Sequence, residues 1–365
     1  MRVLVVNAGS SSLKIGLVDD DAEIAELEFK ATAGRFDDAE LESAVRGMEG
    51  VEAVGHRVVH GGPRYASAVR VTPEVVDYLV SITDMAPLHL PASLAGIAAV
   101  KAILPRVPAV ACFDTSFHSK MPAEASTYAI PLEWRTEYGI RRYGFHGFSH
   151  RYASRRAAEI LGRPEAFLRT VTCHLGSGAS CAAVLGGKSV DTTMGFTPME
   201  GLVMATRSGS VDPGMVLWLE RHAGMTEPQL NEGLDQKSGL VGLAGVADMR
   251  EVLRGMAAGV ERSRLAFDVY VHRLRAHIGS MAAAMNGVDA IVFTGGVGEN
   301  APAVREAAAS GLAFLGVEVD PDLNRKIDGD GDVSAADAEV RTLVVHARED
   351  VEVAREVRGV LSESG

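Results

Sequence analysis

Short apolar runs alternate with longer amphipathic stretches along the chain. The short runs predict β-strands at residues 3–6, 13–18, 54–60, 109–113 and 290–294. Apolar positions at helical spacing predict helices at residues 92–104, 149–161, 262–286 and 351–361. A further helix is expected to start at Pro73, with Thr72 as its N-cap. This alternation of strands and helices predicts an α/β chain with mixed sheets.

One pattern of apolar and polar residues occurs twice, in residues 2–18 and in residues 169–185. In each, an apolar run meets a polar residue (Asn7, His174), a turn of small residues follows, and a second apolar run begins. Each copy predicts a β-hairpin. A turn of Gly and Ser leaves N–H groups and hydroxyls for an anion, although these residues are also common in ordinary turns. The matched pair predicts two related domains that grip one polyphosphate between them.

Composition limits the possible functions. The chain of 365 residues is long enough for two domains. Its formal net charge of −12 argues against general binding of nucleic acid or membrane surfaces, but it permits an anionic substrate at a local cluster of cations. Cys112, Cys173 and Cys181 lie in apolar runs without metal-ligand spacing, which predicts buried thiols. With no leader-like or membrane-length apolar segment in the sequence, we expect a cytoplasmic protein.

The first hairpin turn carries groups that suit phosphate binding. Asn7, Ser10, Ser12 and Lys14 line this turn. The Lys14 ammonium follows at an interval that lets it reach back to a phosphate. The alternative for Lys14 is a solvated lysine at a strand edge.

Two charged residues lie on or just after predicted strands. Arg57 alternates with apolar residues, so it needs an anionic partner, either a bound carboxylate or phosphate or a structural carboxylate. Asp114 follows the strand at 109–113, at the end where α/β sheets bind ligands. It is expected to position magnesium or water or to polarise a nucleophile, with a helix N-cap as the alternative.

A histidine and an arginine are candidates for contacting a phosphoryl group. His146 and His150 have the spacing of zinc ligands on a helix, but the pair lacks the Glu of such motifs, and Gly147 argues against a helix. We therefore favour a His146 that donates to a phosphoryl group. Arg207 lies in a loop with Thr, Ser and Gly, and we expect it to neutralise charge on phosphoryl oxygens.

A Gly-rich turn at residues 296–301 follows a predicted strand, as a dinucleotide fingerprint does, with Glu318 and Asp320 about twenty residues later. Only 45 residues follow Asp320, too few for the rest of a Rossmann domain. An adenosine-binding turn with Asn300 as a polar contact is therefore favoured over a nicotinamide dehydrogenase.

Two other motifs are incomplete. Residues 187–189 end like a P-loop, but Ala182 stands where the first Gly must be. Residues 328–339 resemble a calcium loop, but Val333 occupies the Gly position, which favours an acidic surface loop.

Together, the motifs resemble the acetate kinase family, in the superfamily of acetate and sugar kinases, actin and chaperone ATPases. The likeness covers nearly the whole chain and rests on residues 7–14, 56–62, 87–91, 113–115, 143–150, 206–209 and 298–300. It implies an α/β fold of two duplicated, ribonuclease H-like (actin-like ATPase) domains with mixed sheets and an active-site cleft between them. The implied domains are residues 1–145 and 146–349, with a helix at about 350–365 packed back on the first.

The resemblance also implies a reaction: reversible, direct in-line transfer of the γ-phosphoryl group of ATP to acetate, giving acetyl phosphate and ADP. This places the chain in acetyl-CoA biosynthesis. It implies Mg²⁺, with Mn²⁺ as an alternative, and a homodimer formed through the second domain. Neither nucleic acid nor membrane is expected as a partner.

By the same resemblance, each candidate residue has an implied role. Catalysis falls to Asp114, His146 and Arg207. Arg57 would bind the substrate carboxylate, and the methyl pocket would consist of Val59, Leu88, Phe145 and Pro198. The nucleotide would be bound by Ser10, Ser12, Lys14, His174, Leu175, Gly176, Ser177, Gly178, Asp248, Met249, Arg250, Gly296, Val297, Gly298, Glu299 and Asn300. Asn7 and Glu349 would hold the metal.

Some positions depart from the family pattern. Ser177 stands where the family usually has Asn, Phe148 where it usually has Thr, and the segment between Lys30 and Val51 is short. Glu349 lies in an altered context, so an acid in the first turn of the last helix is its alternative role.

Two other functions stay open. A kinase for propionate or butyrate differs by methylenes worth about 1–3 kcal/mol each, so the sequence leaves the acid open. An actin-like nucleotide-switch ATPase needs no carboxylate pocket, so Arg57 and Arg207 favour the kinase.

Overall fold

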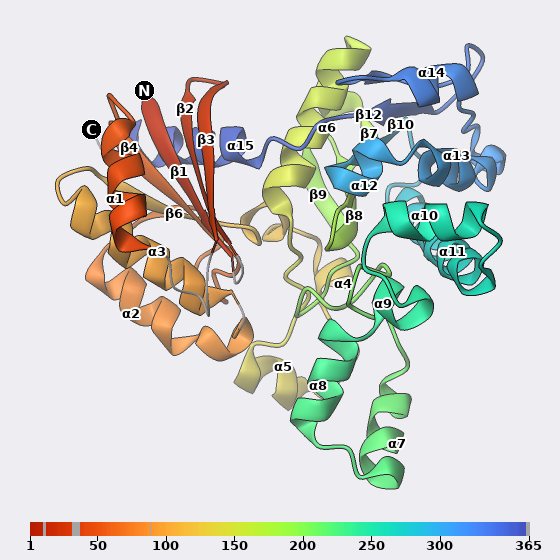
Figure 1. Ribbon diagram of the computed structural model, residues 1–365, viewed down its shortest axis with the longest axis horizontal. Helices are drawn as coiled ribbons and strands as arrows, with labels where there is room; N and C mark the ends of the chain where they lie inside the picture. The colour runs from red at the N-terminus through yellow and green to blue at the C-terminus, as the bar shows by residue number, and fades with distance from the viewer. Residues whose placement is uncertain (10–11, 31–36, 88, 363–365) are drawn as a thin grey trace. The chain divides into compact units, whose positions relative to one another are not determined.

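The computed structural model describes residues 1–9, 12–30, 37–87 and 89–362 (Figure 1). Two of the sequence candidates, Ser10 and Leu88, lie outside these residues. The strands are β1 (Arg2–Ala8), β2 (Ser12–Asp19), β3 (Ala22–Lys30), β4 (Ala53–Val58), β5 (Val69–Arg70), β6 (Ala109–Phe113), β7 (Arg169–Leu175), β8 (Ala179–Leu185), β9 (Lys188–Thr192), β10 (Ala290–Thr294), β11 (Gly331–Asp332) and β12 (Arg341–Val344).

The helices include several short ones. The α-helices are α1 (Asp38–Gly47), α2 (Pro73–Ser81), α3 (Leu90–Ile103), α4 (Ala123–Ser126), α5 (Leu132–Tyr138), α6 (Gly147–Leu161), α7 (Pro213–Ala223), α8 (Glu227–Gln236), α9 (Gly239–Ala244), α10 (Met249–Ala257), α11 (Glu261–Ala284), α12 (Gly295–Asn300), α13 (Pro302–Ser310), α14 (Pro321–Lys326) and α15 (Glu349–Ser362). The 3₁₀ helices are η1 (Thr83–Met85), η2 (Ser116–His118), η3 (Glu165–Phe167) and η4 (Ala313–Leu315).

The same sheet is built twice. The first sheet has the strand order β3-β2-β1-β4-β6-β5, and the second has β9-β8-β7-β10-β12-β11. In both, three antiparallel strands come first and two parallel strands follow, with a short antiparallel strand at the far edge. The two predicted hairpins are β1–β2 and β7–β8, in equivalent places. The α/β fold with duplicated mixed sheets is confirmed.

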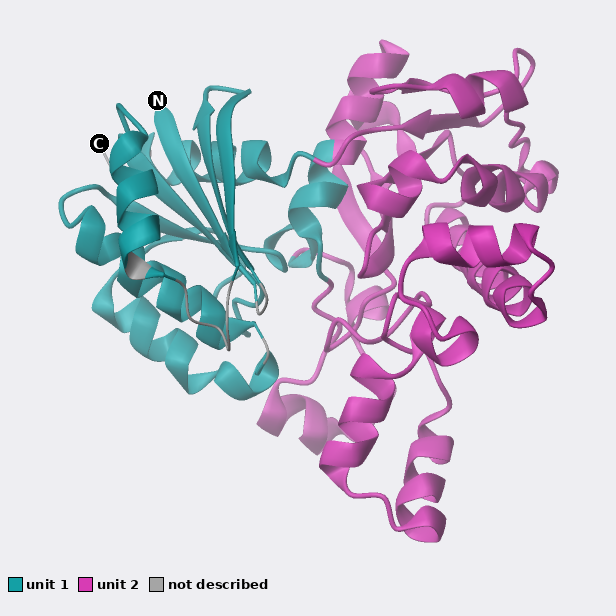
Figure 2. Cartoon of the chain, in the orientation of Figure 1, with its two compact units in different colours: residues 1–119, 145–152, 348–365 teal, residues 120–144, 153–347 magenta. Residues whose placement is uncertain are grey.

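The chain divides into two compact units, which Figure 2 colours separately. Unit 1 comprises residues 1–119, 145–152 and 348–365, and unit 2 comprises residues 120–144 and 153–347. These units are defined by their internal contacts, so the expected domain limits at 1–145 and 146–349 stay a prediction.

Helices cover both faces of the first sheet, which explains why its strands are apolar on both sides. On one face, Leu4 and Val6 of β1 pack with residues of α1 and α3. On the other face, Val3 and Val5 pack with α15 residues, among them Val353. In unit 2, the long helix α11 packs on β7, β8 and β9.

Most predicted elements are confirmed within a few residues. The strands at 109–113 and 290–294 have the predicted limits, and Thr72 caps α2 by accepting a hydrogen bond from the Val75 N–H. The argument from Gly147 against a helix is wrong, because α6 begins at this residue. A Cβ on Gly147 would lie 2.2 Å from the Asp114 carbonyl oxygen, so glycine permits the close approach with which this helix starts.

Candidate active site

Three predicted site residues lie at one edge of the first sheet. Asn7 is near the end of β1 and is in register with Arg57 on the parallel strand β4. Asp114 directly follows β6, the next strand along. Because the carboxyl ends of parallel strands meet at one edge, the sheet itself brings these side chains together.

Arg57 is held between two carboxylates. Its Nε and Nη2 each donate to Asp114 at 2.8 Å, and its Nη1 lies 3.0 Å from Oε2 of Glu349, the first residue of α15. Burial desolvates the guanidinium and by itself would lower its pKa, but Asp114 and then Glu349 raise the pKa of Arg57 above its usual value. Arg57 is therefore a permanent cation in a fixed orientation.

The turn at residues 145–147 is fastened beside Asp114. The Gly147 N–H donates to the Asp114 carbonyl, and His118 Nε2 lies 3.0 Å from the Phe145 carbonyl. The buried Phe145 ring meets the His60 ring edge-on at 5.5 Å. His146 has a φ of 56°, a left-handed conformation that costs energy in a non-glycine residue and is typical of functional sites.

The first hairpin turn is closed by a 2.8 Å hydrogen bond from the Gly9 N–H to the Ser12 carbonyl. Lys14 lies on β2 opposite Asn7. Its ammonium is 3.7 Å from Glu26 and 3.9 Å from Glu28 on β3, in weak, exposed ion pairs. The Lys14 side chain is about half exposed, and its role in phosphate binding stays a prediction.

In unit 2, the second hairpin turn is joined to the loop that carries Arg207. Gly176 donates to Gly178 across the turn, and the Ser177 carbonyl accepts a hydrogen bond from the Ala205 N–H. His174, near the end of β7, is in register with Thr294 on β10. The turn at Gly176–Gly178, the Arg207 loop and the end of β10 therefore belong to one edge of the second sheet.

Arg207 is oriented by its own neighbours in unit 2. Its Nε donates to Asp235 at 3.0 Å, and its Nη1 donates to the carbonyl of Pro198 at 3.2 Å. Arg207 and Pro198, for which the sequence implied separate roles, are thus in contact. The Arg207 side chain is about one fifth exposed, so it is fixed but accessible.

The Gly-rich turn after β10 forms the short helix α12. A Cβ on Gly295 would lie 2.9 Å from the Leu175 carbonyl oxygen, so this glycine packs against the end of β7. A Cβ on Gly296 would meet nothing within 4 Å. The Asn300 side chain donates to the Gly296 carbonyl at 3.0 Å. The turn thus offers open backbone at Gly296, beside the second hairpin.

The predicted segment Asp248–Arg250 lies at the start of α10. Asp248 caps this helix by accepting from the Arg250 N–H, and the exposed Arg250 guanidinium folds back on the same carboxylate. Met249 is buried.

The two predicted metal ligands are both neighbours of Arg57 in the fold. Asn7 is its neighbour across the strand register, and Glu349 is its ion-pair partner. Oxygen donors of this kind suit Mg²⁺, which one or two carboxylates commonly hold together with waters and substrate phosphates. Among the described residues, no three His, Cys, Asp or Glu side chains gather as a metal cage. One amide oxygen and one carboxylate are a donor set that fits an ion held jointly with phosphate oxygens.

The site candidates are divided between the two units. Unit 1 contains Asn7, Ser12, Lys14, Arg57, Val59, Asp114, Phe145, His146 and Glu349. Unit 2 contains His174, Leu175, Gly176, Ser177, Gly178, Pro198, Arg207, Asp248, Met249, Arg250, Gly296, Val297, Gly298, Glu299 and Asn300.

Sequence reasoning missed the residues that orient the candidates. Asp235, the partner of Arg207, is 28 positions away, and no pattern marks it. His60 was noticed only as part of a motif, and its ring contact with Phe145 had no signal in the sequence. Both depend on tertiary packing.

Comparison with solved structures identifies the fold. The chain is similar to the crystal structure of acetate kinase from Porphyromonas gingivalis, with a TM-score of 0.90, 36% identity and 99% coverage of both chains. It is also similar to a propionate kinase from Francisella tularensis, with a TM-score of 0.91, 34% identity and coverage of 98% of this chain and 99% of that one. The fold is therefore the duplicated, ribonuclease H-like α/β fold of the actin-like ATPases.

Sequence relatives give the family. The model of the acetokinase family matches residues 30–355. Acetate kinase from Gloeobacter violaceus is 47% identical over 399 residues, and that from Geobacillus kaustophilus is 42% identical over 388 residues, each with 98% of both chains covered. The chain belongs to the acetokinase family. In the described part of the chain, no helix combines the length and the apolar character needed to cross a membrane.

Proposed function

We propose that the chain transfers the γ-phosphoryl group of ATP to the carboxylate of acetate, reversibly, giving acetyl phosphate and ADP. The observation that carries this proposal is the orientation of Arg57 by Asp114 and Glu349. These contacts use three of the five N–H groups of the guanidinium, and the other two suit a carboxylate or acyl phosphate oxygen.

The chemistry needs positioning more than it needs a base. A carboxylate oxygen forms the new O–P bond, the bond from the γ-phosphorus to the bridging oxygen breaks, and no proton must move. Two anions must be brought in line, so cations must cancel their repulsion. Arg57 binds the substrate carboxylate, while His146 and Arg207 bind the phosphoryl oxygens. Asp114 acts as the active-site acid that fixes Arg57.

The acid is proposed to be a short-chain one. We assign its methyl group to Val59, Leu88, Phe145 and Pro198, of which Leu88 lies outside the described residues. Support comes from Phe145, which is buried and held by the His60 ring. The solved propionate kinase has the same fold, so propionate is the alternative acid.

The nucleotide is assigned to groups from both units. The phosphates are assigned to Ser10, Ser12, Lys14 and the turn at His174–Gly178, whose N–H groups suit an anion. The adenosine is assigned to the backbone of Gly296–Asn300 and to Asp248–Arg250. The open space at Gly296 supports this assignment.

Asn7 and Glu349 are proposed to hold Mg²⁺, with Mn²⁺ as an alternative. When bound, the ion supplies charge neutralisation for the phosphate oxygens. Glu349 also keeps its contact with Arg57, so one carboxylate binds both the metal and the arginine that binds the substrate.

We further propose a cytoplasmic homodimer that acts in acetyl-CoA biosynthesis. The three buried, unpaired thiols support a reducing compartment. The dimer is supported by α7 in unit 2, which contains no buried residue and exposes Leu217 and Trp218 by about half.

The test is acyl phosphate formation. Purified protein is incubated with ATP, Mg²⁺ and either acetate, propionate or butyrate, and acyl phosphate is trapped with hydroxylamine. We expect acetate to react fastest, and Arg57→Ala and Arg207→Ala to lower kcat/KM by about 100-fold or more, because each removes a charged donor to a reacting oxygen.

Two exposed arginines provide matched controls. Arg46→Ala in unit 1 and Arg325→Ala in unit 2 each break a surface ion pair and should leave the rate unchanged. Preference for a longer acid would keep the mechanism and change the substrate. ATP binding without any acyl phosphate would contradict the proposal and favour a nucleotide switch.

A further inference from the structure

The carboxylate of Glu299 connects two segments of unit 2. Its Oε1 accepts a hydrogen bond from the Gly295 N–H at 2.8 Å and another from the Ala347 N–H at 3.0 Å. Its Oε2 lies 3.7 Å from Nε2 of His346. One side chain of α12 therefore fixes both the start of its own turn and the backbone at 346–347.

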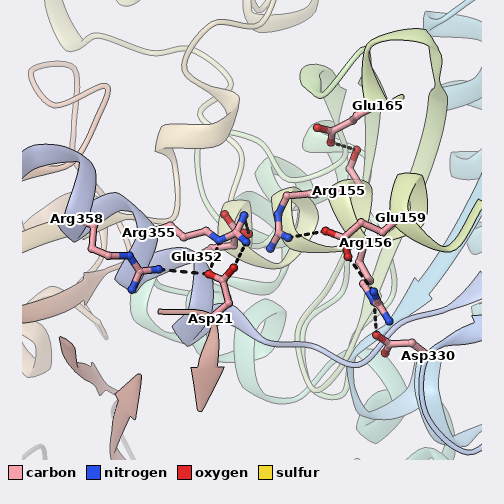
Figure 3. Close-up of polar contacts among 10 residues, drawn as sticks. Asp21, Arg155, Arg156, Glu159, Glu165, Asp330, Glu352, Arg355 and Arg358 are labelled. Carbon is pink, nitrogen blue, oxygen red and sulfur yellow. Dashed lines mark hydrogen bonds and ion pairs between the residues drawn. The ribbon is translucent and has the colours of Figure 1, made fainter. Parts of the chain in front are cut away.

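The segment at 346–347 is where the chain leaves unit 2. Unit 2 ends at Ala347, and Glu349 follows only two residues later as the first residue of α15. Asp330 provides a second anchor, because its Oδ1 accepts from the His346 N–H at 2.9 Å. The other Asp330 oxygen accepts from Arg156 of α6 at 2.7 Å (Figure 3). The chain thus reaches Glu349 from a segment with two carboxylate anchors.

The backbone that carries Glu299 is itself rigid. Arg305 is fully buried and donates from Nη1 to the carbonyls of Gly298 and Glu299, at 2.8 and 2.7 Å. Its Nε and Nη2 donate to the side chain and carbonyl of Asn324. Arg305 therefore satisfies the carbonyls at the end of α12, and the Glu299 side chain projects from a fixed base.

We propose that Glu299 is a positioning residue: it sets the path of residues 346–348 and thereby holds Glu349 against Arg57. Its carboxylate accepts hydrogen bonds from two backbone N–H groups, those of Gly295 and Ala347, and it acts through these bonds. The adenosine is assigned to the backbone of the turn. This inference rests on the proposed function for its catalytic consequence. Its structural part, the tie between Glu299 and Ala347, is testable by itself.

The experiment compares Glu299→Ala, Glu299→Asp and Glu299→Gln with the parent protein. The exposed neighbour Glu306→Ala on α13 is the matched control. Glu299→Gln keeps the Oε1 acceptor, whereas the shorter side chain of Glu299→Asp cannot reach both segments. The Asp variant therefore carries the test if the Ala variant fails to fold. Three quantities are measured: amide exchange of the peptide 345–350, the Kd for ADP, and kcat with the KM for ATP.

We expect faster amide exchange at 345–350 in the Ala and Asp variants, because the Ala347 N–H loses its acceptor. Their kcat should fall about 10–100-fold through misplacement of Glu349, while the Kd for ADP stays within about twofold. Glu299→Gln should keep amide exchange at 345–350 at the parent rate, because it keeps the acceptor for the Ala347 N–H. Glu306→Ala should behave like the parent protein in all three measurements.

Two results would overturn the proposal. One is unchanged exchange in both the Ala and Asp variants. The other is ADP binding weakened alike in the Ala, Asp and Gln variants, which would make Glu299 a direct nucleotide contact. If the parent protein formed no acyl phosphate, the proposed function would fail, and the exchange and ADP-binding results would still decide the role of Glu299.

Discussion

At the scale of single residues, Glu356 on α15 is a carboxylic acid in an unfavourable place. One oxygen accepts hydrogen bonds from Ser116 and Arg151, at 3.2 and 2.9 Å, and the other is buried. Burial raises the pKa of Glu356 to about 7, Arg151 opposes this, and Glu352 adds to it. At pH values between 4.5 and about 7, the folded protein therefore holds a proton on Glu356 that the unfolded chain has already released.

The sign of the pH effect follows from that proton. Between the ordinary carboxyl value of 4.5 and about 7, the folded state binds more protons than the unfolded state, so stability falls as pH rises through this window. Glu356→Gln, which mimics the protonated acid, should raise the free energy of unfolding at pH 8 by about 1–3 kcal/mol and change it little at pH 5. Urea titrations at the two pH values would measure this.

The control for Glu356 is an exposed acid. Glu42→Gln on α1 breaks only a surface ion pair with Arg46 and should shift stability by less than about 1 kcal/mol at either pH. Equal effects of Glu356→Gln at pH 5 and pH 8 would show that the buried acid stays charged.

At the scale of elements, the packing of α15 on the first sheet depends on a glycine. A Cβ on Gly55 of β4 would lie 2.8 Å from methyl groups of both Val353 and Val357. Gly55→Ala should therefore push α15 away from the sheet and destabilise the protein by about 1–3 kcal/mol. The melting temperature would report the loss.

The same substitution at a glycine inside a helix gives the control. A Cβ on Gly279, inside α11, would meet nothing within 4 Å. Gly279→Ala should raise stability by up to about 1 kcal/mol, because alanine favours a helix more than glycine does. A neutral Gly55→Ala would mean that α15 has room to move.

Individual elements also show how far the sequence could be interpreted. The strand at 290–294 and the two hairpins were predictable because a buried strand has a local apolar pattern. Phe148 was noticed only as a departure from the family, whereas the structure buries it beside Val353. Likewise, the sequence indicated that Arg57 needs an anion, but it could not identify Asp114 and Glu349, which are 57 and 292 residues away. Partners at such separations depend on the fold.

At the scale of the whole molecule, the exposed face of α7 bears on assembly. Trp218 stacks on His222 at 4.6 Å, yet it is 55% exposed. A second copy covering this helix would give a particle of twice the 38.5 kDa chain mass. Light scattering should find that mass, and Trp218→Asp should shift the protein to the single-chain mass. A Trp218→Asp protein that stays dimeric would place the interface elsewhere.

Unit 1 is assembled from three separate stretches of chain, and the third is synthesised only after all of unit 2. When a ribosome has completed residues 1–119, the face of β1, β4 and β6 that packs on α15 still lacks its cover. All of unit 2 must be translated first, which takes roughly ten to forty seconds. Unit 2 has no such wait, since its residues are complete at Ala347. The nascent chain therefore finishes its second half before its first, and the unprotected sheet is the surface that chaperones would meet.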